Sequence, residues 1–163
     1  MGAFTMIKTT VTDAGNAKDA IEKALKDFMT DKFVTIGIHE DAGAHDDSGI
    51  SNAQLGATME FGTDNGNIPA RPWLRPGVES GNEEYLNIIT DGLEDQQPLE
   101  QLLEVVGLVA VSKVQQYMVD LRSPPNTPET IARKGSSNPL IDTGSLRQSV
   151  THKVSSEKPT EGL

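Results

Sequence analysis

The chain has 163 residues, no cysteine and a formal net charge of −10 at pH 7. The length favours one domain with a substantial hydrophobic core, and the lack of cysteine excludes a disulfide framework and thiolate chemistry. The acidic balance argues against a protein that wraps nucleic acid, since such binding needs clustered Lys and Arg, but it suits a surface past which DNA slides without binding.

The sequence contains no signal for export or membrane insertion. No apolar run approaches the roughly 18 residues that a membrane span requires. Residues 1–12 lack the basic segment and the apolar segment of a secretory signal. Together with the absence of cysteine, these features suit an intracellular product.

The first part of the chain is predicted to contain two helices and one strand. Residues 14–29 carry an apolar stripe at helical spacing. Residues 33–38 are rich in the β-branched and aromatic residues typical of strands, and a polar loop, residues 39–49, follows them. Residues 50–61 predict a second helix, and Gly62 is expected to end it in the left-handed conformation.

A proline-rich arm, residues 63–77, comes next and holds three prolines within eight residues. Each proline fixes its own φ near about −65° and disfavours the α region for the residue before it. Ile68, Arg71 and Arg75 are therefore predicted to be extended. Such an arm is semi-rigid and has little conformational entropy left to lose when it docks on a partner.

The arm also contains the single tryptophan, Trp73. Tryptophan and arginine are the residue types that most often supply binding energy at protein interfaces. The alternative is a surface loop whose tryptophan fills the core of its own domain, which is the commoner place for a lone Trp. The candidates for contact with a neighbouring subunit or another partner are Glu60, Phe61, Ile68, Pro69, Arg71, Pro72, Trp73, Leu74, Arg75 and Pro76.

Two longer helices are predicted after the arm. Asn82 caps the first, and the carboxylates in its first turn complement the helix dipole. The second covers residues 98–121 and has apolar residues at helical spacing along its whole length. Pro98 falls in its first turn, where the missing N–H costs nothing. We expect this to be the core helix.

A short helix is predicted from the residues at its two ends. Thr127 is the cap, Pro128 is the first helical residue, and Gly135 follows two basic residues in the last turn. This combination of Thr-Pro at the start and Gly after the end is typical of a compact surface helix.

The last predicted elements are a helical turn, a strand and a tail. Asp142 or Thr143 caps the turn, which carries Leu146. Polar and apolar residues then alternate over residues 149–154 as in a strand, and the polar tail, residues 155–163, is predicted to be mobile unless a partner orders it.

All these elements predict a single α+β domain over residues 1–163. In this domain an antiparallel β-sheet packs with several helices, and the long helix near residues 98–121 forms the core.

Catalytic and metal-binding signatures were sought in the sequence. The loop His39, Glu40, His45, Asp46 and Asp47 concentrates potential metal ligands, but its spacing fits neither a helical zinc motif nor an EF-hand. The Gly-Ser pair at 144–145 lacks the nucleophile-elbow frame, and no phosphate-binding Gly-rich motif is present. We expect no catalytic residue, metal or cofactor, and hence a structural or interaction protein; a metal-dependent hydrolase built on the 39–47 loop is the alternative from another class.

Four segments in order resemble a known family. They are V-T-I-G-I at 34–38, M-E-F-G with I-P-A-R-P-W-L-R-P within 59–76, S-P-P-N-T-P-E-T-I-A-R-K-G at 123–135, and P-L-I-D-T-G-S-L at 139–146. Together they resemble the tail-completion or neck proteins, also called virion-morphogenesis proteins, of long-tailed double-stranded DNA bacteriophages. The second and fourth segments are specific in combination. The motif positions that carry over include Pro128, Gly135, Asp142, Thr143, Gly144 and Leu146.

The resemblance implies a small α+β subunit without enzymatic activity. Such subunits form a ring, usually sixfold, at the junction of head and tail, and genomic DNA passes through the lumen without specific binding. The implied partners are other copies of the chain, the head-completion or portal-side connector, and the tail terminator or tail tube protein. The implied location is the neck of the virion, with synthesis in the host cytoplasm. A tail terminator or a head-side adaptor is the alternative within this structural class.

Overall fold

The computed structural model describes residues 31–39, 44–45 and 49–158. The chain divides into two units, Met1–Asp31 and Lys32–Leu163, and all the described helices and strands belong to the second unit. The helix predicted over residues 14–29 and the end of the tail, residues 159–163, lie outside the described residues. The prediction of one domain over the entire chain therefore stays a prediction.

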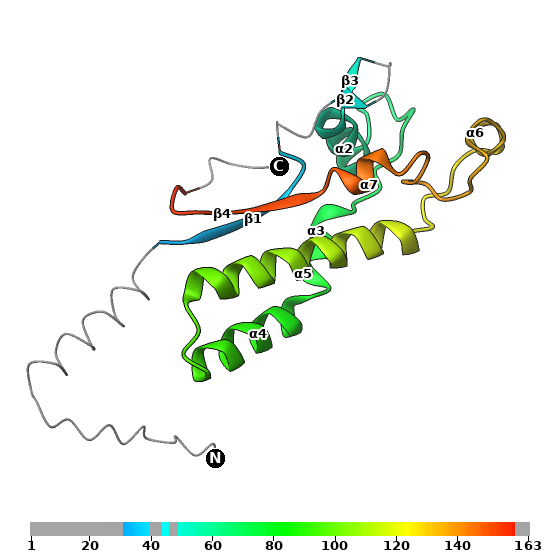
Figure 1. Ribbon diagram of the computed structural model, residues 1–163. Helices are drawn as coiled ribbons and strands as arrows, with labels where there is room; N and C mark the ends of the chain where they lie inside the picture. The colour runs from blue at the N-terminus through cyan, green and yellow to red at the C-terminus, as the bar shows by residue number, and fades with distance from the viewer. Residues whose placement is uncertain (1–30, 40–43, 46–48, 159–163) are drawn as a thin grey trace, which may run out of the picture. The chain divides into compact units, whose positions relative to one another are not determined.

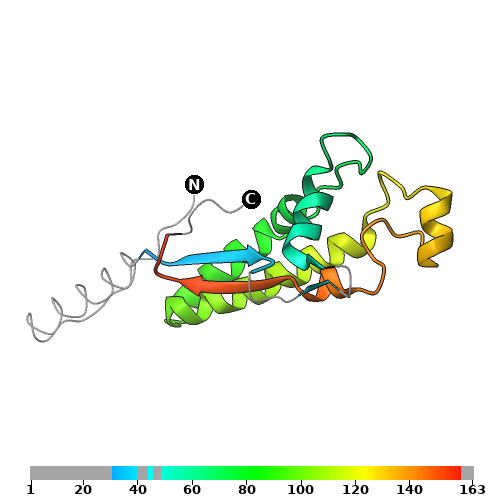
Figure 2. The same ribbon diagram turned by 90° about the horizontal axis from the view of Figure 1, so that it is seen from above.

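The main sheet of the second unit is formed by its first and its last strand in the sequence. β1 (Phe33–Gly37) and β4 (Thr151–Ser155) pair antiparallel, and they run side by side in Figure 2. Both strands were predicted, although β4 extends to Ser155, which the sequence placed in the tail. A second two-stranded ladder joins β2 (Ala44–His45) to β3 (Ile50–Ser51).

The long helix α5 (Leu99–Asp120) is the central element, as predicted. The β1–β4 sheet, α3 (Leu74–Glu79) and α4 (Asn82–Glu94) all contact it, and Figure 1 shows α4 running beside it. Its fully buried side chains recur every four residues, which places them on one stripe of the helix: Ala110, Val114 and Met118. The α+β fold predicted from the sequence is therefore what the structure has.

By length and composition alone, α5 is also the one helix in the described part of the chain that is long and apolar enough to cross a membrane. A helix at the centre of a globular core passes the same test. The contacts of α5 with a sheet and two helices account for its buried stripe, whereas Val105 and Leu108 of the same helix are exposed.

A close approach of backbones joins α3 to α5. A Cβ added to Gly77 of α3 would lie 2.8 Å from the Cα of Val114. Only glycine fits such a contact without moving one of the helices. Gly77 therefore fixes the distance between the two helices.

The start of α3 corrects the prediction for the arm. Leu74, Arg75, Pro76 and Gly77 are helical, so the arm ends at Trp73 and Arg75 is not extended. Pro76 is the third residue of the helix. The first-turn N–H groups of a helix have no acceptor within it, so a proline costs no hydrogen bond there and the residue before it can be helical.

The helix that precedes the arm is α2 (Asn52–Phe61), which agrees with the predicted range. Ser51 and Gln54 form a reciprocal capping box at its start. Gly62 follows it with φ 76° but ψ −167°. The positive φ was predicted, whereas the extended ψ differs from the left-handed helical conformation and directs the chain into the arm.

The short helix α6 (Pro128–Lys134) matches its prediction at both ends. The Thr127 hydroxyl accepts a hydrogen bond from the Thr130 N–H at 3.3 Å, and Gly135 is left-handed with φ 68°.

Two predicted caps are wrong. Gly144, with φ 88°, occupies the cap position of α7 (Ser145–Gln148), and no side chain caps the helix from there. Thr143 instead accepts a hydrogen bond from the Ser145 N–H at 3.3 Å, from one residue outside the cap position. Asp142 caps no helix through the hydrogen bonds between described residues. At α4, Gly81 rather than Asn82 occupies the cap position.

Trp73 lies in the hydrophobic core of its own subunit. Its side chain is 3% exposed and belongs to the buried cluster. Its indole N–H donates a hydrogen bond to the Gly56 carbonyl of α2 at 3.0 Å. Of the two interpretations of this residue, the core one is confirmed, and the indole is not available to a neighbouring subunit. The other members of the cluster are Val114, Met118, Leu140, Leu146 and Val150.

The turn between α4 and α5 contains the one non-glycine residue with positive φ in the described part of the chain. Gln96 has φ 59°, and the Gln97 N–H bonds the Gly92 carbonyl at 2.9 Å. This is the hydrogen bond of a Schellman motif, in which the left-handed position normally holds glycine. The left-handed conformation costs a glutamine about 1 kcal/mol.

We predict that Trp73→Ala lowers the free energy of unfolding by about 3–5 kcal/mol, because it opens a large cavity in the core. Trp73→Phe, which keeps an aromatic ring but loses the indole N–H, should lower it less. Urea unfolding of both variants, followed by circular dichroism, measures the effect. An unchanged unfolding midpoint in the alanine variant would show that the indole does not stabilise the subunit.

We further predict that Gln96→Gly raises the free energy of unfolding by up to about 1 kcal/mol, because glycine takes the left-handed conformation without a steric cost. Gln97→Gly is the matched control, since Gln97 does not have a positive φ. This control should be neutral or destabilising. Equal effects of the two substitutions in chemical denaturation would contradict the prediction.

Candidate functional site

The arm folds back on its own chain instead of projecting from it. The Thr63 N–H donates to the Ile68 carbonyl at 3.0 Å, and the Arg71 N–H donates to the Met59 carbonyl of α2 at 2.7 Å. The Asn65 side chain closes the turn by accepting from the Thr63 hydroxyl at 2.8 Å. These bonds give the arm one fixed conformation beside α2.

Glu60 of α2 positions the end of the arm. One of its carboxylate oxygens accepts hydrogen bonds from the N–H groups of Trp73 at 2.6 Å and Leu74 at 2.9 Å. These groups open α3, whose own cap residue supplies no side-chain hydrogen bond. A carboxylate at the start of a helix accepts hydrogen bonds from the free N–H groups there and interacts favourably with the positive end of the helix dipole. Glu60, a candidate interface residue, thus has an internal role.

Arg71 is 6% exposed and holds the arm against the segment that follows α5. Its Nε donates to the Pro124 carbonyl at 2.9 Å, and its Nη2 donates to the Pro125 carbonyl at 3.1 Å and to the Asn126 side-chain oxygen at 3.4 Å. Burial lowers the pKa of the guanidinium. Arg71, one of the candidates for contact with a partner, thus uses these donors within its own chain.

Two asparagines continue this network into the segment 138–141. The Asn126 amide donates to the Asn138 carbonyl at 3.1 Å. The Asn138 side chain accepts from the N–H groups of Leu140 and Ile141 at 2.9 and 3.0 Å, and it donates to the Val119 carbonyl at the end of α5 at 2.9 Å. The arm, the α5–α6 connection and the 138–141 turn are therefore joined into one corner of the fold.

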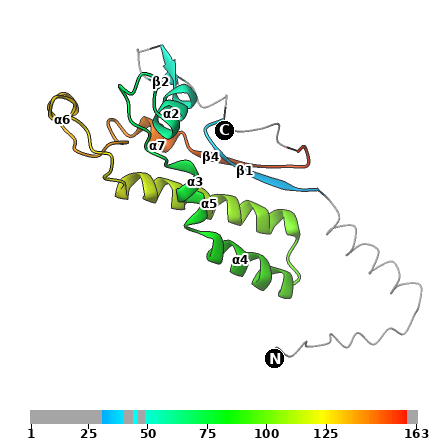
Figure 3. The ribbon, with the colours of Figure 1, turned by 180° about the vertical axis from the view of Figure 1, so that it is seen from behind.

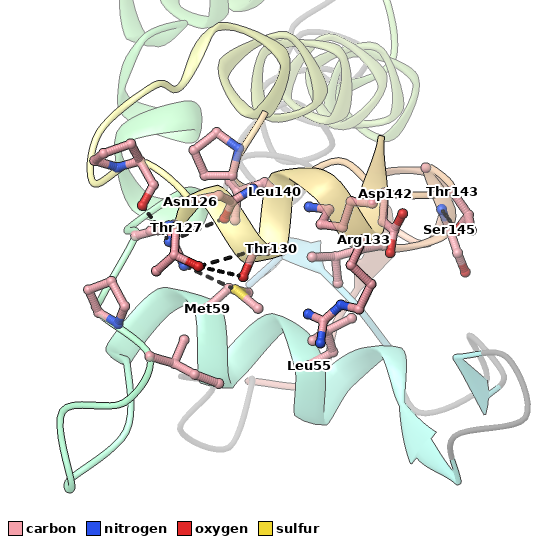
Figure 4. Close-up of a pocket in the computed structure, with 18 of the residues that line it drawn as sticks. Leu55, Met59, Asn126, Thr127, Thr130, Arg133, Leu140, Asp142, Thr143 and Ser145 are labelled. Carbon is pink, nitrogen blue, oxygen red and sulfur yellow. Dashed lines mark hydrogen bonds between the residues drawn. The ribbon is translucent and has the colours of Figure 1, made fainter. Parts of the chain in front are cut away.

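This corner encloses a cavity of about 340 Å³. It is shown in Figure 4, where Arg133 of α6 extends over it toward Leu55 of α2. Residues from α2, the arm, α6 and the segment 139–146 line it. The volume is at the lower end of the roughly 300–1,000 Å³ that is usual for ligand sites. Its apolar lining includes Leu55, Met59, Ile68, Pro69, Leu140 and Leu146.

The charge of the cavity is opposite to that of the whole chain. Arg71, Arg133 and Lys134 line it, with Asp142 as the one carboxylate among its lining residues. Burial lowers the pKa of Lys134, Arg71 and Arg133 lower it further, and Asp142 opposes these effects. The cavity therefore carries an excess of positive charge in a chain of net charge −10.

The remaining interface candidates differ in exposure. Pro69, Pro72 and Arg75 are exposed, Ile68, Leu74 and Pro76 are half-buried, and Phe61 is 60% exposed. Phe61 and Arg75 border a second hollow, next to α3. Contact with a partner through these exposed side chains stays a prediction.

The motif residues near the cavity also differ in exposure. Leu146 is 4% exposed and belongs to the core, whereas Asp142 and Thr143 are exposed and line the cavity. Pro128 and Gly135 delimit α6, which forms one wall. Their roles in the fold are therefore to build the cavity and its walls.

The predicted metal-ligand loop is only partly described. His39 lies with one ring nitrogen 2.7 Å from the Thr151 hydroxyl and the other 3.3 Å from the Thr35 hydroxyl. Glu40, Asp46 and Asp47 lie outside the described residues. Within the described residues no group of three or more His, Cys, Asp or Glu could hold a metal ion. The metal alternative stays untested.

Comparisons of the chain with protein-family models, with curated proteins and with solved structures found no match.

We predict that Arg71→Met lowers the free energy of unfolding by about 2–3 kcal/mol, because it leaves two carbonyls and an amide oxygen without their donor. Arg71→Lys should recover only part of this loss, since a single ammonium cannot match the planar fork of a guanidinium. Arg75→Met is the matched control, and as an exposed change it should stay within about 0.5 kcal/mol. Equal unfolding midpoints for the two methionine variants would contradict the role given to Arg71.

Proposed function

We propose that this chain is a structural subunit of the neck of a long-tailed double-stranded DNA bacteriophage. In this proposal it is a ring-forming tail-completion protein that joins the head-side connector to the tail terminator around the DNA channel. The proposal starts from the four segments that resemble this family, and it assigns no catalytic activity to the chain.

The observation that carries the proposal is the convergence of these segments in space. Three of them, within residues 59–76, 123–135 and 139–146, build the same corner and line the same cavity. Arg71 joins the segment within 59–76 to the segment 123–135, and Asn126 joins the latter to Asn138, the residue directly before the segment 139–146. The remaining segment, residues 34–38, contains most of β1. Segments matched by chance would have no reason to form one structural unit.

The charge of the chain is consistent with a ring around DNA. The formal net charge of −10 repels phosphate, so DNA would pass through the lumen without being held. A ring requires heterologous contacts, in which two different surfaces of the same chain meet and the rotation closes. We place the subunit in the virion neck after synthesis in the host cytoplasm, with six copies as the expected number.

The proposal predicts the phenotype of a virus that lacks this gene. Negative-stain microscopy of the lysate should show filled heads and finished tails lying separately, because the joining ring is missing. Complementation with the wild-type gene is the control and should restore joined particles. Abnormally long tails would instead assign the chain to the tail terminator, and normal infectious particles would overturn the proposal.

A further inference from the structure

The cavity and the α4–α5 turn lie at opposite ends of the second unit. The turn, residues 94–98, comes directly before α5 in the chain. The cavity is built partly from α6, which comes after α5. α5 has 22 residues, so it separates its two ends by about 33 Å. Figure 3 shows α6 and the α4–α5 turn at the two ends of α5.

The cavity end has a free cation. Arg133 is exposed and has no polar partner among the described residues. Lys134 beside it donates to the Asn138 carbonyl at 3.2 Å. The two cations outnumber the single carboxylate of the cavity even when the buried Arg71 is left out. An acidic group that entered the cavity would also oppose the lowering of the pKa of Lys134.

The other end has free carboxylates on a projecting turn. Glu94 and Asp95 are exposed, and in the described part of the chain neither side chain has a hydrogen bond or an ion pair. Glu100 nearby is different, because Lys32 already pairs with it at 3.3 Å.

We propose that the acidic α4–α5 turn of one copy docks in the basic cavity of the next copy. Asp95, with Glu94 beside it, would face Arg133 and Lys134 of the neighbouring copy. Each chain would then donate a turn at one end and a cavity at the other. This inference rests on the proposed ring and names the contact that builds it.

The two halves of this contact are different surfaces of one chain, so the contact is heterologous. Contacts of this type propagate head to tail and close into a ring when the rotation between copies permits it. Opposite charges at the two ends also favour this arrangement over head-to-head or tail-to-tail pairing, since like charges repel.

The test is a pair of charge reversals in the full chain. Arg133→Glu makes the cavity more acidic, so it should repel the acidic turn of the neighbouring copy. Asp95→Lys makes the turn basic, so it should repel the basic cavity; lysine also suits the C-terminal end of α4. In sedimentation velocity at low salt, the association constant of each variant alone should be at least about tenfold lower than that of the wild type.

Mixing the two variants provides the decisive result. In an equimolar mixture the acidic cavity of one variant meets the basic turn of the other, and the unchanged cavity and turn also match. Assembly should therefore recover in the mixture, as alternating copies, and also in the double variant Arg133→Glu/Asp95→Lys. A mixture that stays as weakly associated as its two components would overturn the contact.

Two exposed charges outside the contact serve as matched controls. Lys158→Glu and Glu157→Lys reverse single exposed charges and should leave self-association unchanged. Thermal unfolding should show that every variant is folded at the temperature of the assembly experiment, so that a loss of assembly is not a loss of fold. Arg133→Glu should lower the unfolding midpoint only slightly, because it places an acid in the last turn of α6. If the wild type forms rings and both charge-reversed variants form them equally well, this contact is overturned while the ring proposal stays intact. A wild type that stays monomeric at every concentration would count against both.

A virus that carries Arg133→Glu tests whether the cavity receives another protein instead of a second copy of this chain. If Arg133→Glu blocks head–tail joining while the purified variant still assembles normally, the cavity receives an acidic segment of another neck protein. That outcome would overturn docking between copies of this chain.

Discussion

The buried guanidinium of Arg71 is the interaction on which the corner around the cavity depends. It bonds the Pro124 carbonyl 53 residues further along the chain and the Pro125 carbonyl beside it. Neither proline can donate a backbone hydrogen bond, so this segment offers acceptors only, and a guanidinium, which has donors and no acceptor, is its natural complement. The same interaction fixes the arm on one side and leads through Asn126 to the 138–141 turn on the other. Arg71 therefore joins two of the walls of the cavity directly and the third through Asn126.

The sequence was sufficient for most of the elements, because these depend on local signals. The apolar period of α5, the Thr-Pro and Gly at the ends of α6, and the alternation in β4 are properties of short windows. These local signals do not depend on contacts with the rest of the chain. The pairing of β1 with β4 was expected only as an antiparallel sheet, since the sequence does not record which strands meet.

The cavity could not be predicted, because long-range contacts between polar side chains build it. Nothing near Glu60 in the sequence indicates that its carboxylate caps a helix thirteen residues later, and an arginine between prolines looks like an exposed contact residue rather than a buried one. The rule that a residue before a proline avoids the helical region was also misleading at Arg75. There the position of Pro76 within the first turn of α3 outweighs this steric preference. The Asn-Pro pair at 138–139 was the one available signal, since this dipeptide often begins a turn.

The burial of Trp73 has a practical consequence for solution studies. It is the single tryptophan of the chain, it is 3% exposed, and its N–H is bonded to Gly56. Its fluorescence therefore reports the integrity of the core around α2, α5 and α7. The cluster that surrounds Trp73 shares Leu146 with the cavity lining. Intrinsic fluorescence therefore follows the folding of this part of the subunit without any added label.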